Sequence, residues 1–311
     1  MAEIIQKDGT WTFDGDAVRI VPGSDKSVSL LRRTIGELTV PLEAIAGISF
    51  EAGRKTGRLR LRLRNGADPL LQITGGTKSD SMDPYLLTVE SDRSGVAEYF
   101  VDEVRNSLLL EQVPTGPVDR YLLRGPDLPI SVGAGDGTAA FDGEQIRLSW
   151  NWKTEESKSS GGPRIIAVED VEAVEWQPSA GLEGGHLRFV VARVSARTPP
   201  KYDPYAIDLW GFRKDPLMAL VAAAVVARMP HPYAAGRDEP QDAAPAARAD
   251  GASGAGGTAR TGGEPEGTGA GQVSDHDALL RRLRELGELR EAGILTEEEF
   301  TTAKQAILKR M

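Results

Sequence analysis

Four arginines alternate with three leucines in one short run of the chain. The run consists of Arg58, Leu59, Arg60, Leu61, Arg62, Leu63 and Arg64. Because side chains alternate between the two faces of a strand, a strand here would direct all four guanidinium groups to one side. Such a row could bind a phosphate or an anionic lipid headgroup through bidentate contacts. The alternative is a solvated strand face whose arginines pair with acidic residues of neighbouring strands.

Two pairs of acidic residues surround glycines in similar peptides. One pair is Asp14 with Asp16, and the other is Asp142 with Glu144. Each pair supplies two carboxylates, whereas calcium takes about six to eight oxygen ligands. Asp-Gly favours a tight type I′ hairpin turn, because glycine adopts positive φ at little cost. We therefore expect both pairs to form hairpin tips and not a metal or acid–base site.

The remaining residue types that could support catalysis or metal binding lack the partner residues that such sites need. His186, His231 and His276 have no second histidine or carboxylate at a spacing typical of metal ligands. The absence of cysteine excludes disulfides, thiolate catalysis and thiolate metal sites. No Gly-x-Ser-x-Gly motif indicates a nucleophilic serine. We therefore assign no catalytic residue, no metal and no cofactor, and we expect a protein that is not an enzyme.

Two tryptophans lie two positions apart, just before a polar loop. Trp150 and Trp152 would share one face of a strand, and the loop covers residues 153–162. Packing in the core is one interpretation of this pair. The other is an exposed platform that stacks against a ligand or anchors a partner protein.

The chain contains one domain written twice. The peptide at 8–15 recurs at 136–143 with six of eight residues identical. Residues 36–50 then align with 162–176, and the Asp-Pro-Tyr sequence that starts at Asp83 recurs at Asp203. Landmarks that keep a similar offset while the loops change length are typical of tandem domains.

Each repeat has the pattern of an antiparallel sheet closed by a helix. Period-two alternation predicts six strands in the first repeat, at 17–21, 37–40, 45–51, 58–63, 70–74 and 86–90. An apolar stripe predicts a closing helix over 96–110. The second closing helix, over 216–229, is apolar on nearly all sides. It is either a buried core helix or a contact face with the first repeat or a second chain. The fold class is therefore α+β, with two mainly-β domains.

Composition divides the chain into five segments. We expect repeat 1 over 1–112, a connector over 113–135 and repeat 2 over 136–233, and then a disordered Gly/Ala/Pro linker over 234–274 and a helical hairpin over 275–311. The hairpin carries apolar stripes suited to oligomerisation, because a segment this short needs a partner surface. The stripe residues are Leu279, Leu283, Leu286, Leu289, Phe300 and Ile307.

Two resemblances to known families cover most of the chain. The tail resembles the SHOCT domain, a short C-terminal domain of many bacterial proteins, in its Leu-x-x-Leu spacing and in the peptide Gly293-Ile294-Leu295-Thr296 that leads to Glu299 and Phe300. The repeats resemble a bacterial domain of unknown function that occurs in tandem ahead of such a tail. Their Phe-Asp-Gly, Gly-x-Leu-Arg and Asp-Pro-Tyr elements carry that resemblance. It implies a pleckstrin-homology-like fold, in which seven strands are closed by a C-terminal helix.

The charge balance and the first residues limit the partners further. The chain has 37 basic and 46 acidic residues, a formal net charge of -9, and no strongly basic segment, so we expect no nucleic-acid partner. The first residues show no secretory pattern, so we expect a cytoplasmic protein. The function that we predict is a non-catalytic interaction or scaffold protein whose C-terminal hairpin self-associates or docks a protein partner. The alternative is a peripheral module that binds an anionic membrane surface or a phosphorylated ligand through the arginine run.

Overall fold

The computed structural model describes residues 1–75, 80, 82–179, 184–192, 194 and 198–234. These residues belong to one compact unit, Met1–Gln241. The predicted linker, the C-terminal hairpin and its six candidate oligomerisation residues lie outside the described part of the chain.

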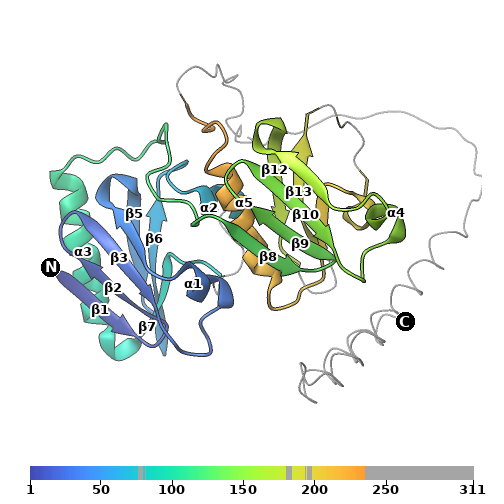
Figure 1. Cartoon of the computed structure of the whole chain (residues 1–311). Coiled ribbons are helices and arrows are strands. Elements are labelled where there is room, and N and C mark those ends of the chain that lie inside the picture. The colour runs from blue at the N-terminus through green and yellow to red at the C-terminus, as the bar shows by residue number, and fades with distance from the viewer. Residues whose placement is uncertain (76–79, 81, 180–183, 193, 195–197, 235–311) are drawn as a thin grey trace, which may run out of the picture. The chain divides into compact units, whose positions relative to one another are not determined.

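The first repeat consists of two antiparallel sheets and a closing helix (Figure 1). Its strands are β1 (Ala2–Gln6), β2 (Gly9–Phe13), β3 (Ala17–Pro22), β4 (Leu38–Pro41), β5 (Ile45–Glu51), β6 (Thr56–Leu63) and β7 (Leu86–Glu90). The sheet orders are β1-β2-β3-β4 and β5-β6-β7. Its helices are α1 (Leu30–Ile35), η1 (Leu42–Ala44), α2 (Pro69–Thr74), η2 (Ser91–Arg93) and α3 (Ser94–Leu110). The last of these packs against β5 and β1 and closes the repeat, as predicted.

The second repeat has the same architecture. Its strands are β8 (Ile130–Ala134), β9 (Gly137–Phe141), β10 (Gln145–Trp150), β11 (Arg164–Ala167), β12 (Val171–Gln177), β13 (Gly185–Val191) and β14 (Ala206–Leu209). The sheet orders are β11-β10-β9-β8 and β12-β13-β14. Its helices are α4 (Glu156–Ser159), η3 (Val168–Asp170), η4 (Pro200–Tyr202), η5 (Asp215–Leu217) and α5 (Met218–Val226). Among the described residues, each repeat has seven strands and a closing helix, which confirms the pleckstrin-homology-like arrangement.

Strand β8 lies inside segment 113–135, which the sequence predicts as a connector. Residues 130–134 pair with 137–141 of β9 across a tight turn at Gly135, where φ is +56°. The first sheet begins in the same way, since β1 pairs with β2 along its whole length. Each repeat therefore starts with a hairpin ahead of its Phe-Asp-Gly peptide, and the second repeat begins at Ile130.

One predicted strand is a helix. Residues 69–74 form α2 because Asp68 caps its first turn and Pro69 occupies its first position. Oδ1 of Asp68 accepts a hydrogen bond from the Leu70 N–H at 2.9 Å, and Oδ2 accepts one from the Tyr85 hydroxyl at 2.7 Å. The apolar run of 70–74 is too short for its periodicity to separate strand from helix, and the capping residues decide the outcome.

The Phe-Asp-Gly peptides are hairpin tips, as predicted, but their turn type differs. Oδ1 of Asp14 accepts hydrogen bonds from the backbone N–H groups two and three residues later, at 3.0 and 2.9 Å. Asp142 repeats both contacts at 2.9 and 2.7 Å. A type I′ turn needs positive φ at two central residues, whereas here the glycine alone has it, +114° at Gly15 and +116° at Gly143. The aspartates therefore shape these turns through their side chains.

The two repeats share part of one core. Every residue of α5 is buried, because the helix packs on β8, β9 and β12 of its own repeat and against α2 of the first repeat. Leu31 and Leu70 of the first repeat join the second apolar cluster, and Ile35 and Ile73 pack against it. Both interpretations of the apolar helix are therefore correct: α5 is a core helix and also a contact with the first repeat.

Candidate functional site

The arginine run follows the strand that the alternation predicts. In β6 the side chains of Leu59, Leu61 and Leu63 are buried, whereas those of Arg58, Arg60 and Arg62 are exposed. Arg64 directly follows the strand and is half-buried. The predicted row of guanidinium groups on one face of the sheet is therefore present for three of the four arginines.

Two of these arginines share one carboxylate. Nη2 of Arg58 lies 3.2 Å from Oδ2 of Asp80, and Nη2 of Arg60 lies 2.8 Å from Oδ1 of the same residue. Arg62 makes no ion pair within the described residues. The face resembles the solvated, acid-paired alternative more than a row of free cations. Anion binding by the arginine run stays a prediction without support from this geometry.

Arg64 holds main-chain segments together. Its guanidinium donates to the carbonyl oxygens of Glu43 at 3.0 Å, Gly116 at 2.8 Å and Pro117 at 3.2 Å. These carbonyls come from η1 and from the segment that follows α3. Arg64 therefore fastens the connector to the first repeat, and its donors are not directed at a ligand.

A cleft of about 490 Å³ opens beside the arginine run. Its charged lining residues are Lys7, Asp8, Arg32, Arg58, Asp80 and Glu90. Lys7 pairs with Glu90 at 2.7 Å, so each cation of the cleft has an acidic partner within 4 Å. The three positive and three negative charges balance, and the cleft is polar without being strongly cationic.

A buried ion pair is part of the lining of this cleft. Arg32 of α1 is 6% exposed, and its Nη1 lies 3.6 Å from Oδ2 of Asp8. Its Nη2 also donates to the Asp8 carbonyl at 3.3 Å. The same carboxylate accepts the backbone N–H of Thr88 in β7 at 3.1 Å. One aspartate therefore joins the turn between β1 and β2, a short helix and an edge strand.

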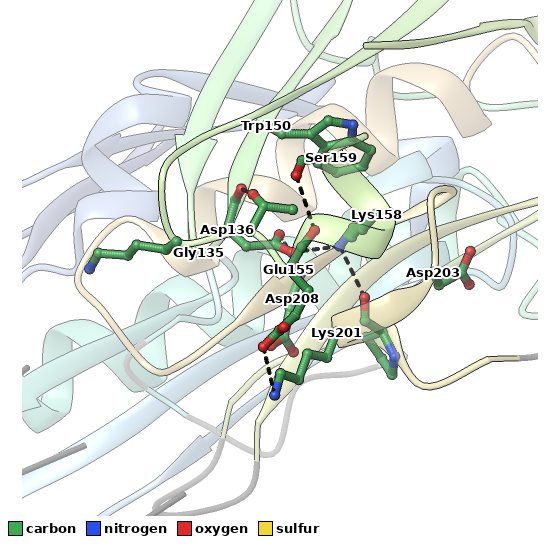
Figure 2. A network of polar contacts seen from close by, with 12 residues as sticks. Gly135, Asp136, Trp150, Glu155, Lys158, Ser159, Lys201, Asp203 and Asp208 are labelled. Carbon is green, nitrogen blue, oxygen red and sulfur yellow. Dashed lines mark hydrogen bonds and ion pairs between the residues drawn. The ribbon is translucent and has the colours of Figure 1, made fainter. Parts of the chain in front are cut away.

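The second repeat builds the same junction more tightly (Figure 2). Lys158 of α4 is fully buried, and its Nζ lies 2.5 Å from Oδ2 of Asp136. Oδ1 of Asp136 accepts the backbone N–H of Asp208 in β14 at 2.9 Å. The lysine also donates to the Pro200 carbonyl at 3.0 Å and lies over the Trp150 ring, 4.7 Å from its centroid. Asp136, Lys158 and β14 thus correspond to Asp8, Arg32 and β7.

Burial sets the electrostatics of this junction. Loss of water raises the pKa of Asp136, and the charge of Lys158 opposes the shift. Burial also raises the pKa of Asp208, whose Oδ2 accepts a hydrogen bond from Trp210 Nε1 at 2.8 Å. At the exposed hairpin tips the direction is opposite, because backbone N–H donors lower the pKa of Asp14 and Asp142.

The polar atoms of Asp136 bond to other parts of the fold. The carboxylate of Asp136 contacts Lys158 and accepts the backbone N–H of Asp208. Its carbonyl oxygen accepts hydrogen bonds from the Asn151 N–H and the Thr154 hydroxyl. Sequence reasoning missed this junction, although the repeated Asp8 and Asp136 peptides carried its acidic half.

The two tryptophans do not share a strand face. Strand β10 ends at Trp150, which is half-buried and donates its Nε1–H to the Gly162 carbonyl at 2.8 Å. Trp152 lies in the following turn and is 80% exposed. Core packing therefore describes Trp150, and the exposed alternative describes Trp152.

The family comparison follows the same duplication. The model of a domain of unknown function, DUF4429, matches residues 11–105 and 139–226, which together make up more than half of the chain. The chain belongs to the DUF4429 family. A second family model, the short C-terminal domain SHOCT, matches residues 281–308. No curated protein matches the chain. The expected order of two DUF4429 repeats followed by a SHOCT domain is therefore confirmed.

Membrane-spanning helices and metal-binding groups are both absent from the described part of the DUF4429 protein. No helix there is long and apolar enough to cross a membrane. No group of three or more histidine, aspartate and glutamate side chains there could hold a metal ion.

Proposed function

We propose that this DUF4429 protein is a non-catalytic scaffold, in which two fused repeats form a platform and the SHOCT tail mediates oligomerisation or partner docking. The observation that carries the proposal is the shared core. Because α5 packs against α2 and Leu31 and Leu70 complete the second apolar cluster, the repeats present their surfaces in a fixed relation. A fixed platform suits a scaffold, since a binding surface that is already ordered costs less entropy to engage.

One further observation supports a role without catalysis. The buried charged residues Arg32, Asp136 and Lys158 bond to other parts of the fold. Catalytic groups, in contrast, need access to a substrate. A cytoplasmic location is part of the same proposal, and the absence of cysteine fits it.

The tail supplies the proposed means of assembly. Its stripe of Leu279, Leu283, Leu286 and Leu289 recurs at helical spacing, and Phe300 and Ile307 form a second stripe. Apolar stripes of this length are stable when a second surface covers them. If the tail holds several chains together, a partner with more than one binding site can contact several platforms at once. Its apparent affinity for the assembly is then higher than for a single chain.

The test is the mass of the protein in solution, measured by light scattering over a range of concentrations. The full chain should exceed the mass of one chain, and the variant Leu283→Asp with Leu286→Asp should fall to that mass. A matched control places the same new residues off the stripes, at Ala278→Asp and Gln305→Asp, and should assemble like the wild type.

Two results would speak against the proposed assembly. In one, the full chain has the mass of a single chain at every concentration, and the wild type and the stripe variant capture the same proteins. In the other, a chain that ends at Gln241, the boundary of the first compact unit, assembles as the full chain does. That second result would place the contact on the repeats and not on the tail.

A further inference from the structure

Three aromatic rings of the second repeat surround one lysine ammonium. The Nζ atom of Lys153 lies 5.2 Å from the ring centroid of Trp152, 5.3 Å from that of Trp210 and 5.3 Å from that of Phe212. An ammonium over an aromatic face within about 6 Å is attracted by the negative charge of the π system. We call these three aromatic residues the ring cluster.

The ring cluster is assembled from two loops. Trp152 and Lys153 follow β10, whereas Trp210 and Phe212 follow β14. The rings of Trp210 and Phe212 stand at 89° to each other with their centroids 6.0 Å apart. Two walls at a right angle, together with the exposed Trp152, form an open cage whose inside is lined by ring faces.

A buried carboxylate fixes the second loop. Oδ2 of Asp215, which is 3% exposed, accepts the backbone N–H groups of Trp210, Gly211 and Phe212 at 2.9, 2.8 and 3.1 Å. Gly211 has φ of +91°, a conformation that glycine adopts without strain. The loop is therefore held in shape by the fold itself, as a binding site requires.

The chemistry of the cage favours a cation that carries no N–H groups. The ammonium of Lys153 makes no hydrogen bond or ion pair within the described residues, so it meets the rings and water. Asp208 accepts the Trp210 Nε1–H at 2.8 Å and places a carboxylate at the edge of that ring. A quaternary ammonium is less strongly hydrated than a lysine and has no donors to satisfy, so it gains more from the same rings.

The first repeat lacks this cluster. By the strand register, Glu90 and Asp92 occupy the positions that Trp210 and Phe212 hold in the second repeat. The aromatic loop is therefore not a requirement of the repeated fold. A loop that is built by the second repeat alone and carries an exposed tryptophan fits a function specific to that repeat.

We propose that Trp152, Trp210 and Phe212 form a binding site for an alkylated ammonium group, and that Lys153 occupies the site as an internal competitor. The ligand displaces the lysine side chain into water and places its charged methyl groups against the three rings. This site is additional to the scaffold role, and it depends neither on the tail nor on the arginine run.

The experiment uses ¹⁹F NMR of the full chain labelled with fluorotryptophan. The five tryptophans give five signals, which single substitutions assign. Choline is titrated at constant ionic strength, and its uncharged isostere 3,3-dimethylbutan-1-ol is titrated in parallel. We expect choline to shift the signals of Trp152 and Trp210 in a saturable way, and we expect the isostere to bind at least about 5-fold more weakly.

Three variants test the parts of the site. Lys153→Ala removes the competitor and should tighten choline binding about 2- to 5-fold. Trp152→Ala should weaken binding about 3-fold or more without loss of the fold, because this side chain is 80% exposed. The matched control is Tyr202→Ala, an exposed ring that Lys201 contacts at 5.2 Å outside the cluster, and it should change nothing.

The outcomes separate the proposal from its alternatives. Equal binding of choline and its isostere would reduce the cluster to an apolar patch and overturn the proposal. Absence of a saturable shift in both the wild type and Lys153→Ala would also overturn it. Where choline binds, Nα-acetyl-trimethyl-lysine amide is titrated in parallel. Tighter binding of choline would indicate a free small molecule as the ligand, and tighter binding of the trimethyl-lysine derivative would indicate a modified protein side chain.

Discussion

Replacement of Lys158 by methionine should be among the most destabilising single changes in the second repeat. The lysine is fully buried and Asp136 is 3% exposed, so the variant leaves a buried carboxylate without its cation. One strong donor remains, the Asp208 N–H at 2.9 Å. Removal of one partner from a buried ion pair costs about 3–5 kcal/mol, and we expect a loss in that range.

Further variants separate the charge from the packing. Asp136→Asn together with Lys158→Met leaves no charge on either member of the pair, and the amide oxygen still accepts the Asp208 N–H, so the double variant should recover about 2 kcal/mol of the loss. Arg32→Met in the first repeat should cost less, about 1–2 kcal/mol, because its contact with Asp8 is 3.6 Å long and water reaches that carboxylate.

The assay is urea unfolding of the full chain, followed by circular dichroism at neutral pH. Lys201→Met is the matched control, because Lys201 is 40% exposed, pairs with Glu155 at 2.8 Å, and should lose no more than about 1 kcal/mol. The reasoning is refuted if Lys158→Met is as stable as this control, or if the double variant is no more stable than the single one.

Three further changes test other parts of the fold. Leu70→Ala, a change in the first repeat, should destabilise the second repeat as well, because Leu70 belongs to the apolar cluster around α5. The free energy of unfolding in urea should fall by about 2–4 kcal/mol. Gly15→Ala should cost about 1–2 kcal/mol in the same assay from backbone strain alone, since φ is +114° and a Cβ there would meet no atom within 4 Å. Burial raises the pKa of Asp68 in the folded state above its ordinary value of 3.8. The protonated carboxyl therefore contributes stability that is fully present below pH 3.8 and is lost as the pH rises through the pKa of the folded state. Unfolding of the wild type and of Asp68→Asn over a pH series should therefore show the wild type losing stability relative to the variant as the pH rises.

Sequence patterns predicted the parts of the fold that one buried face dictates. The leucines of β6 alternate with arginines because one side of that strand meets the core, and this signal is contained in eight residues. The strand expected at 70–74 is a helix because a cap at Asp68 and a proline at the first position outweigh a short apolar run. Strand β8 escaped notice because the surrounding residues are rich in proline and glycine.

The buried junctions were only half visible in the sequence. Asp8 and Asp136 stand at equivalent positions of a repeated peptide, but their partners Arg32 and Lys158 come from the short helices α1 and α4, whose sequences do not resemble each other. The ring cluster had one visible member, Trp152. Its partners follow β14, far along the chain, and no local pattern pairs two loops that meet only through the sheet.

The shared core around α5 has a consequence for how the protein is made. The ribosome releases the first repeat early, with Leu70 and Ile73 of α2 on a face that its own sheets do not cover. The helix that covers this face is the last element of the second repeat. During synthesis the nascent chain therefore carries an apolar surface until translation has passed α5, and that delay is the interval in which a chaperone would meet it.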